Sequence, residues 1–226
     1  MIDILQHAQP RIAPLVPDTF RPTIIYTDAN YQIDGAHKRC CDLTEEDSQH
    51  AHKDLPNGWG IVIFSPHRPP IVTSGHVPPN LLHQFTSSKA FIYFLEAWTA
   101  VIAPVLFQPL LTHPYIQLCD NEASKHAIIK GTGKHQPLNN IIGAHWTWHN
   151  RCQLHQILDR VPSKANIADP FSRGDFDIAH KYGWKILRTP HKDILQRTFK
   201  IIGDALFAHT TGFSNLPGLQ AFHDML

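Results

Sequence analysis

The stretch Tyr115-Ile-Gln-Leu-Cys-Asp120 decides the fold class, because an apolar strand pattern ends there in a carboxylate and a helical pattern follows at once. The two-residue period of a strand puts Leu118 and Asp120 on one face. The helical pattern covers residues 122–130, and Gly131 ends it, as glycine commonly does after a last helical turn. A strand that passes directly into a helix indicates an α/β domain.

An earlier strand also ends in an acid. In Thr23-Ile-Ile-Tyr-Thr-Asp28, the side chains of Tyr26 and Asp28 share a face. The segments 58–64 and 70–75 follow as two further short strands, with prolines marking the turn between them. Three strands joined by short or polar connections predict an antiparallel meander.

Helices and two more elements complete the predicted domain. An apolar stripe predicts a helix from about residue 89 until Pro104 forbids its continuation, with Glu96 at the edge of the buried face. Residues 138–152 are predicted as a helix, 155–161 as a fifth strand and 166–172 as the start of a last helix. We therefore predict a five-stranded mixed sheet, three strands antiparallel and then two parallel, flanked by helices.

The length of 226 residues fits one domain with appendages. We predict an N-terminal arm over residues 1–21, the folded domain over 22–175 and a C-terminal helical extension over 176–226. The extension contains an amphipathic segment that either packs on the domain or meets a partner. The polar segment 30–57 is predicted as an insertion loop on the surface.

Composition excludes several classes of protein. With 42% hydrophobic and 17% charged residues, the chain has the balance of a folded protein and not of a disordered one. The net charge of +1 excludes binding of nucleic acid by overall charge alone, so a polyanion must be gripped locally. The four cysteines form no CxxC pattern, which favours a reducing, intracellular location in cytoplasm or nucleus. The apolar stretch 90–111 contains Glu96 and two prolines, which favours a buried helix over a membrane span.

Four scattered carboxylates form the candidate site: Asp28, Glu96, Asp120 and Asp169. Two follow strands and two lie on helices, so all four can converge beyond one edge of the sheet. Oxygen ligands without thiolates suit Mg²⁺ or Mn²⁺, and four acids cannot stay ionised together without cations. Two such ions about 4 Å apart would bridge a scissile phosphate. Glu96 is the most informative acid, because a carboxylate beside an apolar helical face carries a desolvation cost.

Structural roles compete with this interpretation. Asp28 and Asp120 could simply end strands, since Asp is a common turn residue, and Asp169 before Pro170 has the sequence of a helix N-cap. A zinc site is a further alternative, disfavoured because one of its ligands starts the predicted fifth strand. Its four ligands would be His145, His149, Cys152 and His155.

The order of elements and several local segments resemble the ribonuclease H-like domain of reverse-transcriptase-bearing retroelements. The resemblance covers roughly residues 23–174, and the last two matching segments are the specific ones. The segments are Tyr26-Thr-Asp28-Ala, Gly58-Trp-Gly60, Leu95-Glu96-Ala97, Cys119-Asp120-Asn-Glu-Ala123 and Val161-Pro-Ser-Lys-Ala-Asn-Ile-Ala-Asp169-Pro-Phe-Ser-Arg-Gly174.

The resemblance implies that the four acids are catalytic, hold two divalent ions and hydrolyse the RNA strand of an RNA–DNA hybrid. It implies supporting or substrate-facing roles for six further residues: Asn121, Glu122, Ser163, Asn166, Ser172 and Arg173. The planar fork of Arg173 suits a phosphate. A reverse transcriptase polymerase domain is the implied protein partner. No polymerase segment is recognisable before Thr23, so both a fragment and a repurposed module stay open.

Other functions fit the sequence less well. The main alternative is a silent or domesticated module that binds nucleic acid or protein, and its intact acids speak against it. A proofreading-type exonuclease would want Asp-x-Glu where this chain has Asp28-Ala-Asn30. An integrase or transposase would usually close its triad with Glu where this chain has Asp169. The chain departs from the resembled pattern in its 30–57 insertion, where a tight hairpin is more familiar, and in its low net charge.

Overall fold

The computed structural model describes residues 21–31, 57–77, 91–188 and 226. The predicted N-terminal arm, the 30–57 insertion and most of the C-terminal extension lie outside these residues. Strands β1 (Ile24–Ala29), β2 (Gly58–Phe64) and β3 (Ile71–His76) come first. The chain then continues through helix α4 (Phe91–Leu106), strand β4 (Tyr115–Cys119) and helices α5 (Glu122–Lys130) and α6 (Gln136–Arg151). Strand β5 (Gln156–Arg160), helices α7 (Asp169–Ser172) and α8 (Asp177–Tyr182) and strand β6 (Lys185–Arg188) complete the described order.

These strands form one mixed sheet in the order β5-β4-β1-β2-β3-β6. Strands β1, β2 and β3 are antiparallel neighbours, whereas β4 and β5 run parallel to β1 on its other side. The antiparallel meander followed by two parallel strands is the predicted ribonuclease H-like arrangement, and the fold class is confirmed.

The sheet has six strands where we predicted five. Residues Lys185–Arg188 lie in the part predicted as a helical extension, and they instead pair in parallel with β3 from Ile71 to Ser74. The strand is too short to show a two-residue period, and its partner lies more than a hundred residues earlier. Its four residues therefore gave no local strand signal.

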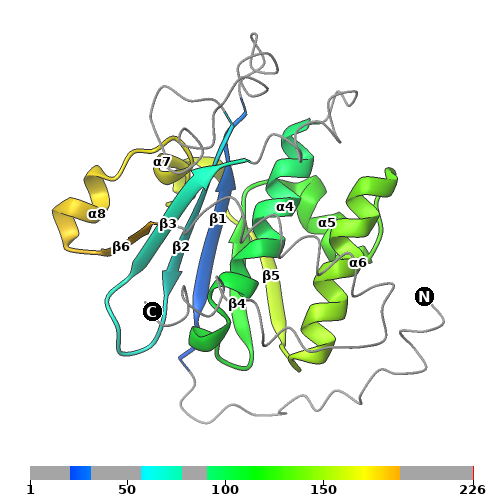
Figure 1. Ribbon diagram of the computed structural model, residues 1–226, viewed down its shortest axis with the longest axis horizontal. Helices are drawn as coiled ribbons and strands as arrows, with labels where there is room; N and C mark the ends of the chain where they lie inside the picture. The colour runs from blue at the N-terminus through cyan, green and yellow to red at the C-terminus, as the bar shows by residue number, and fades with distance from the viewer. Residues whose placement is uncertain (1–20, 32–56, 78–90, 189–225) are drawn as a thin grey trace.

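Helices cover both faces of the sheet (Figure 1). Helices α4, α5 and α6 lie on one face, where the main core gathers around Ile25, Ile61 and Trp98. Helices α7 and α8 lie on the other, where Val62 and Phe171 belong to a smaller buried cluster. Within the described ranges, no helix combines the length and the apolar character needed to cross a membrane.

Helix α4 does not end at Pro104, as we predicted, but continues to Leu106. A proline in a helix has no N–H for the carbonyl four residues earlier, here that of Ala100. The side chain of Gln117 in β4 supplies the missing donor, because its Nε2 lies 2.8 Å from Ala100 O. A buried contact from the sheet therefore satisfies the carbonyl that the proline leaves unpaired within the helix.

Candidate active site

Three of the four predicted acids converge at one edge of the sheet. Asp28 lies near the end of β1, Asp120 directly follows β4, and these neighbouring strands run parallel, so their carboxyl ends meet. Glu96 reaches the same point from α4, where the backbone N–H of Ala29 donates to its Oε1 over 3.3 Å. One carboxylate oxygen from each of the three acids lies within 4.8 Å of the others. This spacing is that of ligands around a single cation.

Burial makes the acid group costly without a cation. Asp28 and Glu96 are each only 3% exposed. Burial raises the pKa of Asp28 to about 7; the Ser172 side chain opposes this rise in part, whereas the charges of Asp120 and Asp169 add to it. Burial also raises the pKa of Glu96 well above its ordinary value, and the charges of Asp28 and Asp120 add to this effect. Two acids that resist ionisation next to a third indicate a site whose charge is balanced from outside the chain.

The oxygen atoms of the group fit a divalent metal ion. Asp28 Oδ2 and Glu96 Oε2 are buried, and no described residue donates a hydrogen bond to either. A buried carboxylate oxygen without a partner is rare, because its desolvation is not compensated. All the candidate metal-ligand atoms are carboxylate oxygens, the ligand type that Mg²⁺ and Mn²⁺ prefer. Asp28, Glu96 and Asp120 are therefore the residues that would hold a metal.

Asn166 holds Asp28 in position. It is 4% exposed, and its Nδ2 donates to Asp28 Oδ1 over 3.1 Å and to the backbone oxygen of Thr27 over 3.0 Å. Its own Oδ1 accepts from the backbone N–H of Ala168 over 3.2 Å. Of the two roles that the resemblance implies for Asn166, the structure places it in the supporting one. Its partner oxygen on Asp28 is thereby fixed, while Oδ2 stays available.

Asp169 lies close to this group without joining it. It is in the first turn of α7, and its carboxylate forms an ion pair with Arg173, with Nη2 2.8 Å from Oδ1. Arg173 Nε also donates to both carboxylate oxygens, over 3.2 and 3.3 Å. The alternative role of Asp169 as N-cap is wrong, because Ala168 occupies that position. Arg173, predicted to face a phosphate, is here engaged with Asp169.

Two glycines allow α7 to approach the sheet. A side chain at Gly60 would place its Cβ 2.5 Å from Ser172 N and 2.8 Å from Ala168 O, and at Gly58 it would collide with Ser172 O. Gly60 is also the residue paired with Asp28 across β1 and β2. The Gly58-Trp-Gly60 segment thus brings α7, and with it Asp169, against the strand that carries Asp28.

The backbone beside Asp120 is fixed by the start of α5. Asn121 is the N-cap residue of α5, and its side chain accepts from the backbone N–H of Ser124 over 3.0 Å. Gly131 ends the same helix with a positive φ of 78°. Asn121 therefore has a defined structural role, and its predicted contact with substrate stays a prediction.

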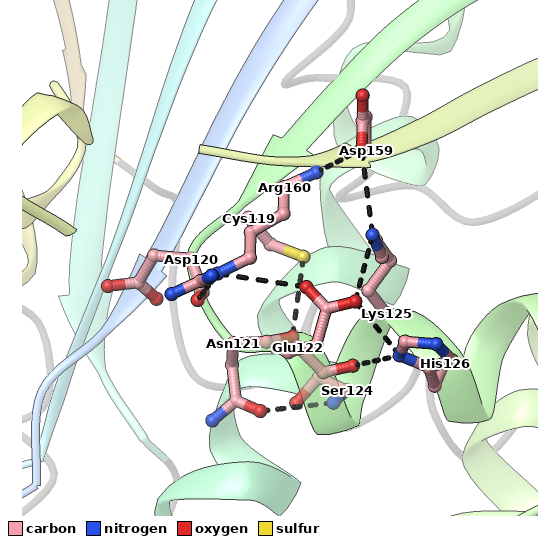
Figure 2. A network of polar contacts seen from close by, with 9 residues as sticks. All are labelled: Cys119, Asp120, Asn121, Glu122, Ser124, Lys125, His126, Asp159 and Arg160. Carbon is pink, nitrogen blue, oxygen red and sulfur yellow. Dashed lines mark hydrogen bonds and ion pairs between the residues drawn. The ribbon is translucent and has the colours of Figure 1, made fainter. Parts of the chain in front are cut away.

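Glu122 lies at the centre of an ion-pair network next to Asp120 (Figure 2). Its carboxylate is 3.0 Å from Lys125 Nζ, 3.1 Å from His126 Nδ1 and 3.7 Å from Arg160 Nε. Arg160 Nε also donates to the backbone oxygen of Asp120 over 3.1 Å. Sequence reasoning missed Arg160, although its position at the carboxyl end of β5 could have indicated it.

The other predicted residues have clear places. Ser163 is exposed in the short turn Ser163–Ala165 that follows β5. Ser172 is 3% exposed, and its hydroxyl donates to the backbone oxygen of Asp169 over 2.8 Å, which closes the turn of α7. Substrate contact by Ser163 therefore fits its exposure, whereas Ser172 supports α7.

The histidines of α6 are occupied by other contacts. His145 Nε2 lies 2.9 Å from Gln156 Oε1, and His149 Nε2 lies 2.6 Å from the hydroxyl of Tyr115. Within the described part of the chain, the only group with metal-ligand spacing is that of the three acids. The zinc alternative therefore gains no support.

Comparison with known proteins gives likenesses in structure alone. No protein-family model matches the chain, and no curated protein matches it. The N-terminal ribonuclease H domain of a Mycobacterium tuberculosis protein, solved as a fusion with maltose-binding protein, is 13% identical with a TM-score of 0.43, over 71% of this chain and 97% of that one. LC11-RNase H1 in complex with an RNA/DNA hybrid is 15% identical with a TM-score of 0.37, over 70% and 99%. A second structure of LC11-RNase H1, isolated from compost, is 14% identical with a TM-score of 0.33, over 71% and 99%. The fold assignment rests on the strand order and pairing described above.

Proposed function

We propose that this chain is a divalent-metal-dependent endonuclease that hydrolyses the RNA strand of RNA–DNA hybrids. The observation that carries the proposal is the group of three converging acids, two of them buried with an unpaired oxygen. The segments around Asp120 and Asp169 support an origin in a retroelement. The same proposal includes a reverse transcriptase polymerase domain as partner and an intracellular location in cytoplasm or nucleus.

The residues of the chain divide the work of such a site. Asp28, Glu96 and Asp120 would hold Mg²⁺ or Mn²⁺, and Asp169 would complete a second ion's ligands. Bound divalent ions lower the pKa of a coordinated water and stabilise the charge of the leaving oxygen. Asn166 fixes one oxygen of Asp28, and the backbone N–H of Ala29 fixes one oxygen of Glu96. Binding of an ion by the remaining oxygens would then cost little further side-chain entropy.

The test is cleavage of a hybrid whose RNA strand carries a label. The wild-type protein should cut that strand with Mg²⁺ or Mn²⁺ and leave a 5′-phosphate, whereas Asp120→Asn should abolish cutting. Asp177→Asn is the matched control, because Asp177 is an exposed acid in the first turn of α8 and lies on the other face of the sheet. A wild-type protein that is folded and cuts the hybrid with neither ion would overturn the proposal.

One observation favours a second candidate function. Asp169 pairs with Arg173 and does not join the three acids. A silent module that binds nucleic acid or protein without metal ions would keep this ion pair. Calorimetric titration with Mn²⁺ separates the two candidates. Binding of Mn²⁺ that Glu96→Gln removes supports the nuclease, and the absence of any divalent binding supports the silent module.

A further inference from the structure

Arg160 lies at the same edge of the sheet as the acids. It is the last residue of β5, and it pairs with Cys119, the residue before Asp120, across the parallel strands β4 and β5. Parallel neighbours end at the same edge, so the side chain of Arg160 starts next to Asp120. Half of that side chain is exposed to solvent.

The guanidinium of Arg160 is held by one nitrogen. Nε donates to the backbone oxygen of Asp120 over 3.1 Å and lies 3.7 Å from Glu122 Oε2. Figure 2 shows the guanidinium between the backbone of Asp120 and the carboxylate of Glu122. Among the contacts of the described residues, none engages its Nη1 or Nη2. The two outer nitrogens of this guanidinium therefore stay available as hydrogen-bond donors at the edge of the acid group.

The neighbouring cations are already engaged. Lys125 is paired with Glu122 over 3.0 Å and with Asp159 over 3.6 Å, and only 16% of its side chain is exposed. Arg173 uses Nε and Nη2 on the carboxylate of Asp169. These cations fix their carboxylate partners, whereas Arg160 is fixed through Nε and keeps its outer nitrogens.

We propose that Arg160 binds a phosphate of the nucleic-acid backbone next to the phosphodiester that the acids receive, an inference that rests on the proposed function. A guanidinium binds a phosphate through two parallel hydrogen bonds, for which Nη1 and Nη2 have the right geometry. Because the contacts of Nε already restrict the side chain, binding costs less conformational entropy than for a free arginine. A chain with a net charge of +1 needs such local contacts, since it has no general attraction for a polyanion.

The test measures binding of a fluorescent RNA–DNA hybrid by anisotropy at several salt concentrations. Ca²⁺ replaces Mg²⁺, and a gel verifies that the hybrid stays intact. Arg160→Ala should weaken binding roughly tenfold and lower the slope of log K against log salt by about 0.9, the value for one phosphate contact. Arg160→Lys should retain most of the slope, because the charge remains, but should bind less tightly than wild type because the fork is lost.

The matched control is Lys181→Ala. Lys181 is an exposed cation on α8, beside β6 at the edge of the sheet opposite β5. The Lys181→Ala substitution removes one positive charge, as Arg160→Ala does, and should leave the affinity and the salt slope at wild-type values. With Mg²⁺, Arg160→Ala should raise KM for the hybrid more than it lowers kcat, because the contact is made equally before and during the reaction.

The outcomes separate this inference from the proposed function. A wild-type protein that binds and cuts the hybrid, combined with an Arg160→Ala variant whose salt slope is unchanged, would overturn the phosphate contact alone. A loss in Lys181→Ala equal to that in Arg160→Ala would overturn it too, since the effect would then be one of overall charge. A folded wild-type protein that neither binds nor cuts the hybrid would overturn both.

Discussion

Replacement of Gly60 by alanine should disturb the site through the backbone of α7. The added Cβ would lie 2.5 Å from Ser172 N, 2.8 Å from Ala168 O and 2.9 Å from Phe171 C. All three atoms belong to the backbone, so no side-chain rotation relieves the contact. To reach an ordinary separation of 3.4 Å, the shortest contact must lengthen by 3.4 − 2.5, or about 0.9 Å.

Overpacking of this kind costs about 1–3 kcal/mol. At roughly 2–4 °C per kcal/mol for a chain of this size, a cost of about 2 kcal/mol lowers Tm by roughly 4–8 °C. Because α7 carries Asp169, its retreat also moves that carboxylate, and a misplacement of roughly 1 Å can cost on the order of a hundredfold in rate. Thermal unfolding and cleavage of the labelled hybrid measure the two effects.

Gly133→Ala is the control, because its added Cβ would meet the far end of the Leu138 side chain instead of backbone. That side chain can adjust, so both Tm and activity should change less than in Gly60→Ala. If Gly60→Ala melts within a degree of wild type and cuts the hybrid at the wild-type rate, the close contact between α7 and β2 is refuted.

Three further experiments test the acid group, the residue that supports Asp28 and the helix that carries Glu96. Burial raises the pKa of Asp28 from 3.8 to about 7, so without divalent ions its ionisation should cost folding stability increasingly as pH rises from 4 to 7, an interval worth roughly 4 kcal/mol. The stability of Asp28→Asn relative to wild type in EDTA should therefore increase from pH 5 to pH 8. Thermal melts in which the two proteins differ by the same amount at both pH values would contradict a raised pKa. Asn166→Ala leaves two buried oxygens without their donor and should weaken Mn²⁺ binding about 10- to 100-fold by calorimetry; unchanged affinity would show that Asp28 needs no support. Gln117→Leu removes the donor to Ala100 O in α4 and also the acceptor of Gln156 Nε2, and it should cost about 1–3 kcal/mol in urea denaturation. Pro104→Ala should recover only the part that belongs to the Ala100 carbonyl, by restoring a helical N–H; no recovery would show that this carbonyl does not limit stability.

Most of the fold is readable from local patterns. Strand β2 covers the predicted 58–64 because that segment is an apolar run. Helix α5 covers the predicted 122–130 because an N-cap residue, Asn121, and a terminal glycine, Gly131, flank it directly. The end of α4 was not readable, since its continuation past Pro104 depends on a donor from another element. Local sequence signals therefore do not predict the end of a helix when that end depends on a contact with a distant residue.

The same distinction applies to the site. Asp28 lies near the end of β1 and Asp120 directly follows β4, and the parallel pairing of these strands brings the two acids together as predicted. The ion pair between Asp169 and Arg173 joins residues four apart and is therefore local. What no local pattern contains is the approach of α7 to β2, which Gly58 and Gly60 allow. The sequence does not mark Arg160 as a site residue, because a charged residue at the end of an edge strand is common. Only its contact with Asp120 O distinguishes it.

The sixth strand covers an edge of the sheet that the segment 23–174 alone would leave open. Without β6, the backbone N–H and C=O groups of β3 would form an open edge, which invites pairing with other copies and aggregation. Ile186 would also be missing from the smaller apolar cluster under α7, and a truncation before β6 would remove Trp184 from it as well. A protein truncated at Gly174, where the resemblance ends, would keep every acid of the site and still expose the edge of β3 that β6 covers. A shortened protein should therefore extend beyond Arg188, because the segment that carries the acids and the segment that completes the sheet are not the same piece of sequence.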